Sequence, residues 1–174
     1  MGEDTASLSV ADLLVYFNHA ESYEDYEGQY AQSVRNDFLV DSLNFSTTAL
    51  EYYDDLLELI EEIDTSNVNS LLGKFGNIAD DARSDRSLRS SEQDLIVGAA
   101  SVGYYSANYW DDYNDTTPLA DGFWKRLIAD VSGFASGFVG TLVLNAQYGW
   151  ELNPIANGVA VGSLASKLAE DDDD

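Results

Sequence analysis

Two stretches near the carboxyl end decide the fold: residues 127–146, LIADVSGFASGFVGTLVLNA, and residues 154–169, PIANGVAVGSLASKLA. Small residues recur about every four positions in both, and a second small row lies beside the first. A glycine inside a helix costs about 1 kcal/mol relative to alanine, so such a series needs a compensating contact. Close approach of two helix backbones supplies that contact. The small residues expected at this helix–helix contact are Ala129, Gly133, Gly137, Gly140, Thr141, Gly158, Gly162 and Ser166.

We therefore expect a long helical hairpin, with helices over about 118–146 and 154–169. These two helices pack on each other or on copies in another molecule. Upstream, apolar residues spaced by three and four predict further helices. These cover residues 9–20, 23–38, 48–60, 66–82 and 91–109. Residues 111–117 form an acidic linker in this interpretation, and Pro118 takes the first position of the next helix.

The predicted fold class is all-α: a bundle of about six or seven helices in one domain. That domain covers residues 1–170, with an acidic, Tyr-rich body over 1–116 and the Gly-rich hairpin over 117–170. Residues 171–174 are all aspartate and are expected to form a disordered acidic tail.

The charge balance excludes several functions. The 174 residues include 32 Asp and Glu against 8 Lys and Arg, a formal net charge of −24. So large a negative charge repels phosphate backbones and excludes nucleic-acid binding. There is no cysteine and a single histidine, His19. Disulfides, thiolate metal sites and sites built on several imidazoles are therefore excluded.

The first Gly-rich stretch also has features of a membrane span. Its 20 residues would extend about 30 Å as a helix, close to the hydrocarbon thickness of a bilayer. Aromatic and basic residues flank it, as at membrane interfaces. These flanking residues are Trp124, Lys125, Arg126, Tyr148 and Trp150. Asp130 inside the stretch opposes insertion. A buried or oligomer-forming hairpin is favoured, and a membrane-inserting one is the alternative.

The acidic linker is a candidate calcium site, where Asp111, Asp112, Asn114 and Asp115 would supply hard oxygen ligands. The stretch departs from the EF-hand template, with Tyr113 at the third position. No other cofactor and no small-molecule ligand is indicated.

No catalytic residues are predicted. His19 has no second imidazole or thiol to work with, and the nucleophile elbow Gly-x-Ser-x-Gly does not occur. The acidic residues around Asp54 and Glu58 are expected to form a solvated helix face. A hydrolase that uses carboxylates alone is the enzymatic alternative, because it needs only two acids across a cleft.

The run Phe123-Trp124-Lys125-Arg126-Leu127-Ile128-Ala129-Asp130, followed by Gly133 and Gly137, resembles small uncharacterised exported bacterial proteins with a glycine-rich C-terminal segment. The resemblance covers about 50 residues and implies an extracellular or cell-envelope location, with no catalytic residues. We expect a non-enzymatic interaction or self-assembly protein whose partner is itself or another helical subunit. A bacteriocin- or pore-former-like activity on membranes is the alternative.

Overall fold

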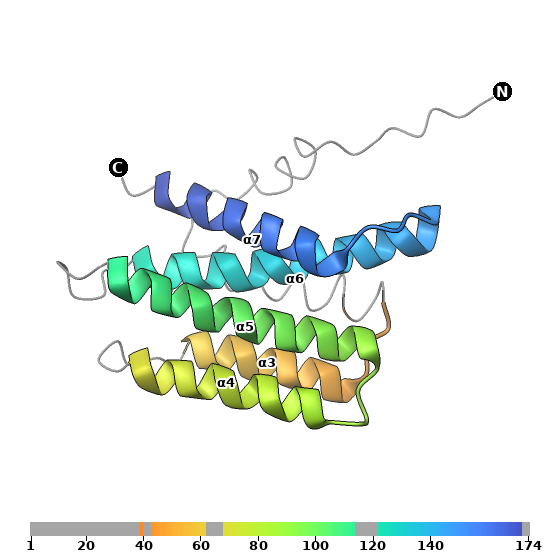
Figure 1. Ribbon diagram of the computed structural model, residues 1–174, viewed down its shortest axis with the longest axis horizontal. Coiled ribbons are helices and arrows are strands. Elements are labelled where there is room, and N and C mark those ends of the chain that lie inside the picture. Colours follow the sequence, from red (N-terminus) through yellow and green to blue (C-terminus); the bar gives the residue numbers. More distant parts are fainter. Residues whose placement is uncertain (1–38, 40–42, 62–67, 114–121, 172–174) are drawn as a thin grey trace.

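The computed structural model describes residue 39 and residues 43–61, 68–113 and 122–171. Every regular element in these ranges is helical, so the all-α prediction is confirmed for this part of the chain. The five helices are α3 (Thr47–Glu61), α4 (Val68–Ser84), α5 (Ser90–Tyr113), α6 (Gly122–Tyr148) and α7 (Pro154–Asp171) (Figure 1). The helices predicted over 9–20 and 23–38 lie outside the described residues.

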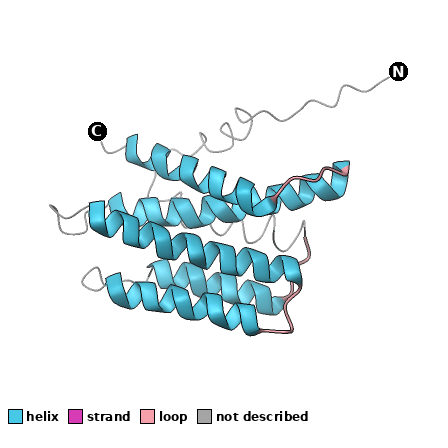
Figure 2. Cartoon of the chain, in the orientation of Figure 1, coloured by secondary structure: helices cyan, strands magenta, loops and turns pink. Residues whose placement is uncertain are grey.

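The helices stack side by side. α7 lies on α6, α6 lies beside α5, and α3 and α4 cover the far side of α5 (Figure 1). The described loops gather at one end of the bundle (Figure 2). α6 and α7 make the most extensive contact between any two of the described helices.

The core is built from the apolar stripes of all helices except α7. In α4 the buried positions are Val68, Leu71, Phe75, Ala79 and Ala82, spaced by three and four as the sequence predicts. The large side chains that are less than 2% exposed come from α3, α4, α5 and α6 and from residue 39; among them are Tyr53, Phe75, Leu95, Phe134 and Phe138.

One buried carboxylate caps two helices at once. Glu92, in the first turn of α5, is 0% exposed. Its Oε2 accepts a hydrogen bond from the backbone N–H of Arg89 at 2.7 Å, and its Oε1 accepts one from the backbone N–H of Ser46 at 2.7 Å. Ser46 and Arg89 directly precede α3 and α5, so these are N-terminal donors that the helices themselves leave unpaired.

The side chain of Arg89 adds an ion pair with Glu92 at 2.6 Å. Burial of Glu92 opposes its ionisation, but the hydrogen bonds from Arg89 and Ser46 outweigh burial and lower the pKa of Glu92 from 4.5 to about 2. The ionised carboxylate thus joins the start of α3 to the start of α5.

Two helices run further than expected. α5 continues to Tyr113, so the prediction of a linker from residue 111 is wrong for Asp111, Asp112 and Tyr113. Neither glycine nor proline occurs between Gly103 and Pro118, so nothing local stops the helix at residue 109. α7 includes Asp171, the first residue of the predicted tail, and the remaining aspartates lie outside the described residues.

Candidate interaction surface

The glycines of α6 and α7 face each other. A Cβ atom added at Gly133 would lie 2.8 Å from the Cα of Gly162, and one added at Gly162 would lie 2.7 Å from the carbonyl oxygen of Asp130. Both distances are shorter than a real carbon contact allows. The two backbones therefore touch at a point where only glycine fits.

A second pair of glycines extends the contact by one turn. A Cβ at Gly137 would lie 2.7 Å from the carbonyl oxygen of Asn157, and one at Gly158 would lie 2.8 Å from that of Phe134. Beyond them, Thr141 Oγ1 accepts a hydrogen bond from Asn157 Nδ2 at 3.1 Å. These small residues are therefore engaged in a contact between two helices of the same chain.

The other residues of the predicted small-residue set lie differently. A Cβ at Gly140 would meet nothing within 4 Å, so this glycine takes no part in the contact. Its row on α6 is offset by one position, about 100° around the helix, from the row of Gly133 and Gly137. Ala129 is half-buried, and Ser166 lies in α7 with its side chain outside the described part of the structure.

The connection between the two helices sets their alignment. Gly149 ends α6 in the left-handed region, at a φ of 67°, which favours glycine. The Asn145 side chain then holds Leu152 by two hydrogen bonds, of 2.9 Å to its carbonyl oxygen and 3.0 Å from its N–H. Asn153 Oδ1 caps α7 by accepting from the N–H of Ala156 at 3.1 Å. The chain therefore turns back sharply and lays α7 along α6.

Because its glycines face inward, α7 presents its larger apolar side chains to solvent. Ile155 and Val159 are each 48% exposed and Leu164 is 38% exposed. Ala156, Ala160 and Ser163 complete the exposed face. Residues 152–166 contain no charged side chain, in a protein of net charge −24. We call this set of six exposed residues the α7 face.

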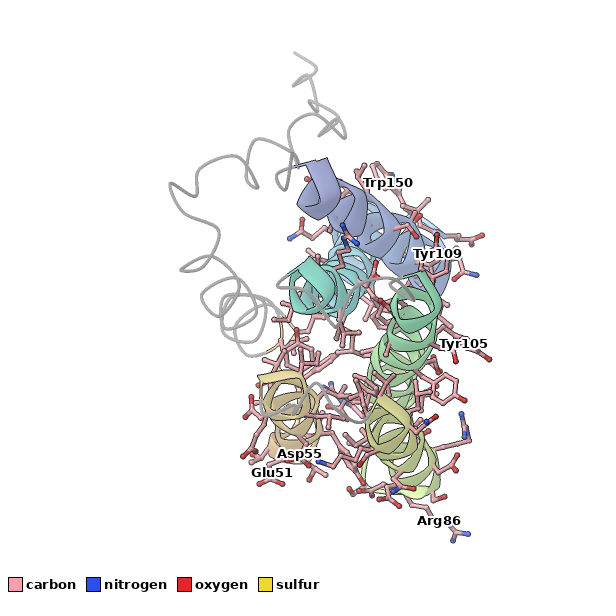
Figure 3. The ribbon with its side chains drawn as sticks, turned by 90° about the vertical axis from the view of Figure 1, so that its left-hand side faces the viewer. Glu51, Asp55, Arg86, Tyr105, Tyr109 and Trp150 are labelled. Carbon is pink, nitrogen blue, oxygen red and sulfur yellow. The ribbon has the colours of Figure 1, made fainter. Side chains whose placement is uncertain are left out.

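One edge of the α7 face borders a groove. Two adjoining hollows, of about 610 and 740 Å³, share Asp94 and Ile155 in their walls. We call them together the α5–α7 groove. α5 and α7 form its walls and α6 forms its floor, and the residues from α5 include Val97, Ser101, Tyr105 and Tyr109. Figure 3 shows Tyr105 and Tyr109 on the outer side of α5.

The ring of Phe134 lies beneath the groove, where it borders the hollow but is 0% exposed. A Cβ at Gly98 of α5 would lie 2.3 Å from this ring, and one at Gly158 of α7 would lie 2.7 Å from it. Phe134 therefore sits between two glycines and spaces α5 from α7. Nearby, the Ser106 hydroxyl donates a hydrogen bond to the Asp130 carboxylate at 2.5 Å, which joins α5 to α6. Asp130, the acidic residue inside the predicted membrane span, thus has a polar partner in the bundle.

The predicted membrane-flanking residues are only partly described. The side chains of Trp124 and Lys125 are outside the described part, and Arg126 is half-buried. Tyr148 and Trp150 are 55% and 48% exposed, and their ring centres lie 5.6 Å apart. The segment Arg126–Tyr148 is long and apolar enough to cross a membrane, although 50% of its most apolar 18-residue stretch is buried in the bundle.

The structure describes the backbone of two of the four proposed calcium ligands, at the end of α5. Asp111 and Asp112 belong to its last turn, whereas Asn114 and Asp115 lie outside the described residues. Within the described ranges, no three or more His, Asp or Glu side chains gather as a metal site would require.

Comparisons with protein families, curated sequences and solved structures find no match. Sequence reasoning missed the groove and the position of Phe134. The signal was present in α5, where Gly98 and Gly103 each make room for a ring, of Phe134 and Phe75 respectively.

Proposed function

We propose that this is a non-enzymatic helical interaction protein that binds another helical subunit through the α7 face. The observation that supports this most directly is the absence of charge over residues 152–166 in so acidic a chain, combined with the exposure of Ile155, Val159 and Leu164. A continuous exposed apolar surface on a soluble protein usually marks a contact site.

The geometry of the glycines explains how such a face is maintained. A free apolar helix would bury its larger side chains against the bundle. Here the backbone contact at Gly133 and Gly162 turns the glycine side of α7 toward α6, so Ile155, Val159 and Leu164 on the other side stay exposed. Burying their exposed area in a complex contributes about 25 cal/mol per Å².

Crosslinking tests the proposal. A photoreactive amino acid at Leu164 in the full chain, irradiated in the native cells, should give discrete protein adducts. The same group at Asn77, an exposed position on α4, should give none. Absence of adducts from Leu164, or the same adducts from Asn77, would contradict the proposal.

Membrane activity is the second candidate, because Arg126–Tyr148 has the length and hydropathy of a span. Insertion would require α6 to leave α5 and Asp130 to lose the hydroxyl of Ser106. Protonation of carboxylates would ease this step, so dye release from anionic liposomes should rise from pH 7 to acidic pH. No release and no lipid partitioning at either pH would eliminate this candidate.

A further inference from the structure

The α5–α7 groove is bounded by three rows of residues at helical spacing. Along the floor, α6 contributes residues four apart: Asp130, Phe134, Phe138 and Leu142. α7 contributes Ile155, Val159 and Ser163, again four apart. The α5 wall runs from Ser90 to Tyr109, a rise of about 28 Å at 1.5 Å per residue.

We propose that this groove binds an amphipathic α-helix of a partner protein, with apolar residues on the buried side and basic residues flanking that side, where they reach Asp94 at the edge of the groove. This inference rests on the proposed function and specifies the chemistry of the partner.

The shape of the groove favours a helix. Rows of side chains four residues apart on three neighbouring helices leave grooves that accept the ridges of a further helix. An incoming helix with apolar residues at positions i, i+4 and i+7 would place them between Val97 and Val159. The groove lining suits an amphipathic helix, because its apolar side chains are interspersed with the hydroxyls of Ser101, Ser106 and Ser163.

The charge of the groove favours a basic partner. Its acidic side chains are Asp94 and Asp130, and no Lys or Arg is among its lining residues. A second copy of the chain would bring a charge of −24 to a surface of the same sign. Residues 1–38 of this chain contain eight acidic residues, and Arg35 is the only Lys or Arg among them, so charge also disfavours them as occupants. A cationic helix gains from both steering and complementarity.

A designed peptide tests the inference on the full chain. The probe is a labelled helix of about 18 residues made of Leu and Lys, with Leu at helical spacing. The controls are the same composition scrambled and the same pattern with Glu in place of Lys. Fluorescence anisotropy at about 150 mM salt limits long-range attraction. The amphipathic Leu/Lys peptide should bind at least about tenfold more tightly than either control.

Variants of the protein locate the binding site. Ser101→Trp places a large ring over the floor and should weaken binding about tenfold, while Asn77→Trp on α4 should leave it unchanged. Val159→Ser changes an exposed side chain without filling the groove and should weaken binding severalfold, which provides a readout if Ser101→Trp fails to fold. Equal binding of the scrambled or Glu peptide would overturn the inference, as would unchanged binding in a folded Ser101→Trp and in Val159→Ser.

A crosslinker at Val97 identifies the other occupants. Adducts to residues 1–38 in purified protein, or to a second copy of the chain, would overturn the inference in favour of those occupants. If the Leu/Lys peptide does not bind while a photoreactive group at Leu164 still gives partner adducts in cells, the basic helix is refuted as the occupant but the proposed function is not. Peptide binding without such adducts would refute the proposed function instead.

Discussion

The Cα atom of Gly162 lies where a side chain on Gly133 would have to be: an added Cβ would come within 2.8 Å of it. This contact joins α6 to α7 at backbone distance and determines which side of α7 meets solvent. The exposed apolar side chains of α7 are a consequence of it.

Replacing Gly133 with alanine should therefore destabilise the protein. The obstructing atoms belong to the backbone of Gly162, so α7 must move away, and overpacking of this kind costs about 1 to 3 kcal/mol. Gly140→Ala, in the same helix, meets nothing within 4 Å and should stabilise by up to about 1 kcal/mol. Thermal and urea unfolding measure both variants. An equal change in unfolding free energy in the two variants would contradict the backbone contact between Gly133 and Gly162.

Gly98 should be equally intolerant, for a different reason. Its added Cβ would lie 2.3 Å from the ring of Phe134, which is 0% exposed and also touches Gly158. We expect Gly98→Ala to cost about 1 to 3 kcal/mol and to change the near-ultraviolet signal of the aromatic core. Gly73→Ala on α4 is the control, because a Cβ there meets nothing within 4 Å. A Gly98→Ala protein as stable as this control would show that Phe134 is free to move.

Some of these relationships could be predicted from the sequence. The four-residue repeat at Gly133, Gly137, Gly158 and Gly162 indicates close helix contact, since helical glycine needs compensation. The apolar stripe of α4 likewise follows from spacing alone. The end of α5 could not be placed, because polar residues such as Asp111 and Asp112 are compatible with both a helix end and a loop.

Relationships across the fold could not be predicted either. Glu92 accepts a hydrogen bond from Ser46, 46 positions away along the chain, and no local pattern specifies such a partner. Periodicity identifies small positions such as Gly98 and Gly140 but not what lies opposite them. One meets a buried ring and the other meets open space. The α5–α7 groove depends on three helices together and is invisible in any one of them.

Glu92→Gln should weaken the junction of α3 and α5. The substitution retains the shape but removes the charge that accepts hydrogen bonds from Arg89 and Ser46. Loss of buried, charge-assisted hydrogen bonds costs about 2 to 3 kcal/mol. Asp94→Asn removes a charge from an exposed position two residues further on and should change stability by less than about 0.5 kcal/mol. Urea unfolding compares the two, and equal effects would contradict the capping role.

The same carboxylate predicts an acid-sensitive stability. The pKa of Glu92 is lowered to about 2 in the folded state from 4.5, so its contribution is fully present above about pH 4.5 and is lost as the pH falls toward 2. The shift corresponds to about 3 kcal/mol. Glu92→Gln should remove this part of the pH dependence of the unfolding free energy. If wild type and variant lose stability in parallel between pH 5 and 2, the prediction fails.

The most direct test of the α7 face is to place charge on it while leaving the glycine contact intact. Ile155→Glu with Val159→Glu adds two carboxylates to exposed positions, and Asn69→Glu with Asn77→Glu adds the same charge to exposed positions on α4. With the photoreactive group at Leu164, the first pair should abolish partner adducts at nearly unchanged unfolding free energy, and the second pair should leave the adducts in place. Adducts that survive Ile155→Glu with Val159→Glu would contradict the assignment of this face as the contact surface.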